Sequence, residues 1–132
     1  MRKAFPFVAA ALAVVAFAGV GLLFSADTKK PKYTVKQVMK EAHAGGKKSL
    51  RAKVLGGSAE KTDKEKLLEL YVALDQNKPP KGDAKHWKKL TAAIVVAAKD
   101  VVADKDGAIK KLTAATTCMT CHKAHKPPEE DD

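Results

Sequence analysis

The residues best suited to chemistry lie close to the carboxyl end of the chain, in the segment Cys118-Met119-Thr120-Cys121-His122. The chain has two cysteines, and both are in this segment. Two thiols at this spacing, followed at once by an imidazole, form the pattern that attaches c-type haem. Each thiol adds to one vinyl group of the porphyrin, and the histidine then ligates the iron. The segment therefore predicts one covalently bound haem c, held by Cys118 and Cys121, with His122 as the proximal iron ligand.

Other uses of the same side chains explain less of the pattern. A disulfide between Cys118 and Cys121 would close a very small loop, and a thioredoxin-like redox pair expects a βαβ context that the sequence lacks. A zinc ion could bind both thiols together with His122 and His125. Structural zinc sites, however, usually take their ligands from two separate segments.

Met39 and His43 are the candidates for the sixth ligand of the iron. Four residues separate them, so on a helix they face the same way. Either side chain could reach the iron, but not both. A thioether raises the reduction potential relative to a second imidazole, which suits an electron carrier. A sixth position left open or filled by water is the third alternative.

Helices are expected to position these residues, because apolar side chains recur at three- and four-residue steps and no clear strand alternation is present. Thr34 is the expected N-cap of the first helix, which Gly45-Gly46 interrupts. A capping box of Thr62 and Glu65 predicts the start of the second helix, and Pro79-Pro80 predicts its end.

The second half of the chain predicts two more helices. Asp83 is the expected N-cap of the third helix, and a turn follows at about residues 104–107. The fourth helix is expected to run from about Ala108 through the cysteine motif. Four helices with short connections predict an all-α, antiparallel four-helix bundle with c-type haem attached near the end of the last helix.

Length, charge and aromatic content narrow the alternatives further. The chain has 132 residues, enough for one domain, and a net charge of +10. Nucleic-acid binding is not expected, because the chain has few aromatics and no recognition motif. All four phenylalanines precede residue 25, which leaves Tyr33, Tyr71 and Trp87 for the rest of the chain. A porphyrin between the helices would supply the large apolar group that this composition lacks.

The amino end has the layout of an export signal. Arg2 and Lys3 precede an uncharged, mostly apolar stretch over residues 4–26. That stretch is also just long enough to cross a bilayer. We therefore expect residues 1–26 to be a cleaved signal peptide or a retained membrane anchor, and residues 27–126 to form the haem domain. Residues 127–132 are expected to be an acidic, disordered tail.

Over about residues 34–126 the chain resembles cytochrome c′ and its low-spin, methionine-ligated relatives, in which the attachment motif lies on the last helix of a four-helix bundle. Met39 matches the position of the sixth ligand in the low-spin relatives, so the resemblance favours Met39 over His43. Trp87 matches a tryptophan near the start of the third helix, and Lys126 matches a basic residue near the proximal histidine. The resemblance implies that both lie in the haem pocket.

Three features depart from the pattern of that family. Val35 stands where the family often has an arginine, and His125 stands where an aromatic residue is common. The Gly45-Gly46 pair breaks the first helix. These departures bear on the contacts of the haem propionates and on the geometry of the distal side.

The expected function is that of an exported, periplasmic single-haem c-type cytochrome that carries one electron and is not an enzyme. The alternative is a gas-binding haem protein, for NO or CO, with an open or displaceable sixth position. Lys123 and Lys126, beside the motif, are expected to attract redox partners with acidic docking surfaces. The resemblance also allows a homodimer formed through the first two helices, and the amino end allows a membrane tether.

Overall fold

The computed structural model describes residues 30–128, and this part of the chain is mostly helical and contains no strand. The helical segments in chain order are α1 (Val35–Val38), the π-helical turn η1 (Met39–His43), the 3-10 turn η2 (Gly46–Lys48), α2 (Leu50–Leu55), α3 (Lys61–Gln76), α4 (Ala84–Val102), α5 (Ala108–Ala115) and α6 (Cys118–His125). The prediction of an all-α fold is therefore confirmed for the described residues. The expected leader (1–26) and the last four residues of the expected tail lie outside them. None of the helices between residues 30 and 128 has the length and apolar character needed to cross a bilayer.

The first part of the first helical arm, formed by α1 and η1, begins and ends where the sequence predicts. The Thr34 hydroxyl accepts a hydrogen bond from the Gln37 amide at 3.2 Å, and the Gln37 side chain accepts one from the Thr34 amide at 2.8 Å. This reciprocal pair satisfies two amide groups that the helix leaves open. This part of the arm ends at Gly45, whose φ of +97° lies in the left-handed region that favours glycine.

Between these ends, the arm changes from α-helical to π-helical hydrogen bonding. The Ala44 amide donates to the Met39 carbonyl at 3.1 Å, five residues back instead of four. Single π-helical turns of this kind are rare and often occur at functional sites. Both candidates for the sixth iron ligand, Met39 and His43, lie in this one turn.

The start of α3 corrects one prediction. The cap is formed by Glu60 and Asp63, not by Thr62 and Glu65: α3 begins at Lys61, and the Asp63 carboxylate accepts a hydrogen bond from the Glu60 amide at 3.1 Å. Asp63 also pairs with Lys53 at 2.9 Å, which joins this cap to α2. The ion pair with Lys53 therefore favours the Glu60–Asp63 cap over the Thr62–Glu65 cap, although the local sequence is compatible with both.

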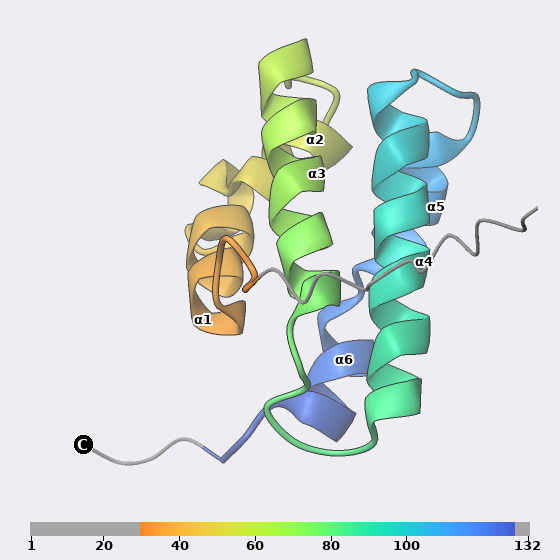
Figure 1. Cartoon of the computed structure of the whole chain (residues 1–132). Helices are drawn as coiled ribbons and strands as arrows, with labels where there is room; N and C mark the ends of the chain where they lie inside the picture. Colours follow the sequence, from red (N-terminus) through yellow and green to blue (C-terminus); the bar gives the residue numbers. More distant parts are fainter. Residues whose placement is uncertain (1–29, 129–132) are drawn as a thin grey trace, which may run out of the picture.

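The helix α4 packs between α3 and α5, and the arm made of α1, η1 and α2 covers α3 (Figure 1). Asp83 caps α4 as predicted, because its carboxylate accepts from the His86 amide at 2.7 Å. At the α3–α4 contact, the buried Thr91 hydroxyl donates to the Asp75 carboxylate at 2.7 Å. The larger side chains of the core are Val38, Val54, Leu67, Leu70, Tyr71, Leu74, Trp87, Ile94, Val101 and Leu112.

The prediction of one continuous fourth helix is wrong. The helix α5 ends at Ala115, and α6 begins at Cys118 after a break at Thr116 and Thr117. Both threonine hydroxyls donate to backbone carbonyls of the preceding turn, the first to Leu112 at 2.7 Å and the second to Ala114 at 3.1 Å. Such bonds compete with the helical pattern. The cysteine motif therefore lies on a short helix of its own, beside the beginning of α4 (Figure 1).

Candidate functional site

The cysteine motif occupies the first five residues of α6 and is open to solvent on one side. Cys118 and His122 are exposed, Cys121 is half-buried against the hydrophobic core, and both thiols are free. Burial raises the pKa of the Cys121 thiol. A redox-active or nucleophilic cysteine needs the opposite shift, toward thiolate. The raised pKa at Cys121 therefore does not fit a thioredoxin-like pair.

A polar cluster of His43, Arg51, Tyr71 and Thr116 lies near the motif, with Tyr71 and Thr116 buried and His43 and Arg51 half-buried. The Arg51 Nε donates to the Thr116 hydroxyl at 2.8 Å, which connects α2 to the break before α6. The Tyr71 hydroxyl and His43 Nε2 form a long hydrogen bond of 3.4 Å. Tyr71 is fully buried. The cluster draws its members from η1, α2, α3 and the α5–α6 connection.

Charges in and around this cluster act on His43. Burial is the main reason that the pKa of His43 falls to about 4, and the positive charges of Arg51 and His122 lower it further. The His122 effect shows that the imidazole of the motif and that of η1 lie within electrostatic range. His43 is therefore neutral at physiological pH, and a neutral imidazole is the form that binds metal.

Tyr71 is held in its neutral form by the same surroundings. Burial raises the pKa of its hydroxyl well above the ordinary range, whereas the positive charge of Arg51 opposes that shift. A negative charge on Cys118 would raise it further, which places this thiol within electrostatic range of Tyr71. His43 and Tyr71 of the cluster thus interact electrostatically with His122 and Cys118, the two ends of the motif.

Met39 lies half-buried against the same hydrophobic core as Cys121. Its thioether needs no hydrogen bond, so it can ligate a metal without leaving another group unpaired. His43 differs in this respect. If its Nε2 bound iron, the hydroxyl of the buried Tyr71 would lose its hydrogen-bond partner, which costs about 1–3 kcal/mol.

Of the other residues expected near the haem, Trp87 lies in the first turn of α4 and Lys126 directly follows α6. Trp87 is buried, and its Nε1 donates to the Asn77 carbonyl at 2.9 Å. Lys126 is exposed directly after α6. His125, which the sequence did not single out as a core residue, is buried beside Trp87 with ring centroids 5.2 Å apart. Its burial depends on contacts with residues about 40 positions earlier, which no local pattern reveals.

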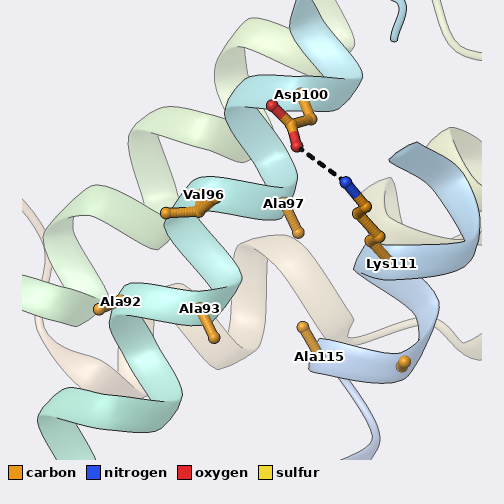
Figure 2. Close-up of a pocket in the computed structure, with 8 residues that line it drawn as sticks. Ala92, Ala93, Val96, Ala97, Asp100, Lys111 and Ala115 are labelled. Carbon is orange, nitrogen blue, oxygen red and sulfur yellow. Dashed lines mark ion pairs between the residues drawn. The ribbon is translucent and has the colours of Figure 1, made fainter. Parts of the chain in front are cut away.

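A shallow groove of about 670 Å³ between α4 and α5 contains no residue of the motif (Figure 2). An ion pair of 3.7 Å between Asp100 and Lys111 lies at one end. The remaining lining is apolar and consists of Ala92, Ala93, Val96, Ala97, Ala114 and Ala115. The groove therefore offers mainly apolar surface, and its two charged groups, Asp100 and Lys111, are paired with each other.

The donor set fits a c-type haem. Cys118 and Cys121 are accessible thiols one helical turn apart, and the exposed His122 imidazole follows them on the same short helix. Between residues 30 and 128, no three His, Cys, Asp or Glu side chains are grouped so that they could hold a metal ion by themselves. Searches against protein-family models, curated proteins and solved structures found no match to this chain.

Proposed function

We propose that the chain is an exported single-haem c-type cytochrome that carries one electron. The observation that carries this proposal is the motif itself, with free thiols at Cys118 and Cys121 and a solvent-facing His122 on a separate short helix. Because Cys118 and His122 are exposed, a porphyrin can approach this face of α6 from the solvent. When bound, the haem supplies the one-electron ferric–ferrous couple, and the chain supplies ligands, burial and a docking surface.

The residues of the distal side have distinct proposed roles. His122 ligates the iron from α6, and Met39 ligates it from η1. His43 and Tyr71 form a polar pair, joined by a hydrogen bond of 3.4 Å, and His43 lies in the same π-helical turn as Met39. His43 is the alternative ligand, available when its hydrogen bond to Tyr71 is broken.

The proposed arrangement of the domain is an antiparallel four-helix bundle. Its arms are α1 with η1 and α2, then α3, then α4, and finally α5 with α6. Contacts between α3 and α4, between α4 and α5, and between the first arm and α3 support this arrangement. Trp87 and Lys126 are proposed to border the haem on the α6 side. The leader predicted for residues 1–26 accounts for export to the periplasm, where haem c is attached.

The absorption spectrum of the exported protein, oxidised and reduced, tests the proposal. We expect a low-spin c-type haem spectrum from the folded protein, and haem that stays with the chain through denaturation and acid–acetone extraction, because the attachment is covalent. Carbon monoxide added to the reduced protein is expected to bind slowly or not at all. Rapid binding would indicate the gas-binding alternative, and a colourless exported protein would rule out both haem functions.

Salt dependence of electron exchange tests the proposed docking surface. Lys123 is exposed on α6 and Lys126 is exposed just after it, so we expect faster exchange with an acidic redox protein than with a basic one. Raising the ionic strength from about 0.05 M to 0.5 M is expected to slow exchange with the acidic partner about tenfold. Lys123→Gln should lower the low-salt rate about twofold. The control is Lys110→Gln, at the other end of α5 from the motif; equal effects of both variants would contradict a localised docking surface.

A further inference from the structure

His125, in the last turn of α6, uses both nitrogens of its ring to bind another part of the chain. Its side chain is 2% exposed. Nδ1 lies 2.7 Å from the carbonyl oxygen of Lys81, in the connection before α4. Nε2 lies 2.9 Å from Nδ1 of His86, in the first turn of α4. A buried imidazole with two such partners is a fixed contact between α6 and the beginning of α4.

The hydrogen bonds determine where the ring protons lie. A carbonyl oxygen only accepts, so Nδ1 of His125 must donate to Lys81. In the neutral ring, Nε2 of His125 is then an acceptor, and Nδ1–H of His86 must donate to it. Both histidines are thus assigned the same tautomer, protonated at Nδ1. The arrangement is satisfied with both rings neutral.

Packing around this imidazole pair is equally specific. The two rings stack with centroids 5.0 Å apart and planes inclined by 27°, and Trp87 meets His125 edge-on. Gly82 has a φ of +83°, and a Cβ at this position would lie 2.6 Å from the Ala124 carbonyl oxygen. The backbone of α6 therefore approaches the chain before α4 more closely than any side chain at residue 82 would permit.

We propose that the imidazole pair of His86 and His125 positions α6, and through it His122, relative to the rest of the molecule. Thr116 and Thr117 separate α6 from α5, so α5 alone does not hold the motif in place. The pair connects α6 to α4 three residues after His122. The part of the inference that concerns iron ligation rests on the proposed function; the part that concerns α6 does not.

Amide hydrogen exchange of the full exported chain tests the contact itself. His125→Phe keeps an aromatic ring at this position but removes both hydrogen bonds, and we expect amides of residues 121–126 to exchange at least about tenfold faster. His86→Ala, which leaves His125 and Trp87 in place, should accelerate the same amides less. His86→Asn should restore slow exchange, because the asparagine amide can donate in place of Nδ1–H. Thr120→Ala, at an exposed position of α6, is the matched control and should have no effect.

A ligation readout separates positioning from general destabilisation. In the haem-loaded protein we expect His125→Phe and His86→Ala to increase the carbon monoxide binding rate at least tenfold, with His86→Asn close to the wild type. The inference would be overturned if, in both His125→Phe and His86→Ala, the amides of residues 121–126 still exchanged slowly and the carbon monoxide binding rate were unchanged. That result would leave the proposed function intact. If the wild-type chain carries no haem, the proposed function fails, and the exchange rates alone decide the role of the pair.

Discussion

Replacing Cys118 and Cys121 together with alanine is expected to give a colourless protein that unfolds at a much lower temperature than the wild type. The physical reason is the small aromatic content of the domain, which has only Tyr33, Tyr71 and Trp87 after residue 26. A covalently held porphyrin would be its largest apolar group. Losing a large buried aromatic group typically costs about 3–5 kcal/mol, or roughly 12–40 °C in Tm for a domain of this size.

Thermal unfolding followed by circular dichroism measures this effect, with haem content measured by absorption of the denatured protein. Met119→Ala is the matched control, because Met119 lies between the two cysteines and is 66% exposed. It should retain haem and melt like the wild type. The expectation fails if the double cysteine variant unfolds as cooperatively, and at the same temperature, as the haem-loaded wild type.

Exchange of the sixth ligand is the second large effect that we expect. Met39→Ala should abolish the far-red sulfur-to-iron absorption band of the oxidised protein but leave the haem low-spin. The reason is that neutral His43 lies in the same π-helical turn and can take the vacant position. The reduction potential should fall, since imidazole replaces a thioether. The proposed exchange breaks the 3.4 Å hydrogen bond between His43 and Tyr71.

Two further variants make this prediction decisive. His43→Ala should keep the far-red band, because Met39 remains in place. The double variant Met39→Ala/His43→Ala should be high-spin and should bind carbon monoxide rapidly, because neither ligand is left. Loss of the band in His43→Ala with its retention in Met39→Ala would reverse the two assignments. A wild-type protein that is already high-spin would show that neither residue ligates the iron.

Much of the helical framework could be predicted, because its signals are local. The apolar spacing identifies the helices, Thr34 and Asp83 mark two N-termini through their own side chains, and Gly45 marks a break through its positive φ. Each of these signals depends on residues a few positions apart. The motif at Cys118–His122 is recognisable for the same reason.

The features that could not be predicted depend on partners distant in the sequence, or on side-chain hydrogen bonds that compete with the helical pattern. The Glu60–Asp63 cap is selected by Lys53, and the burial of His125 depends on Lys81 and His86. The break after Ala115 arises from threonine hydroxyls that compete with a helix whose apolar spacing continues.

The π-helical turn at Met39–His43 also affects how residue positions can be counted along the first arm. A turn closed by a bond five residues back contains one residue more than an α-helical turn, which in an α-helix corresponds to a rotation of about 100°. Each side chain after the turn therefore faces the direction that the adjacent residue would face in an unbroken α-helix. When this chain is aligned with a protein whose first helix is an unbroken α-helix, a one-residue gap is needed at this turn. Counting from Thr34 therefore gives equivalent positions in the two proteins only as far as the turn. Assignment of the sixth ligand by position alone thus depends on which side of the turn that gap is placed.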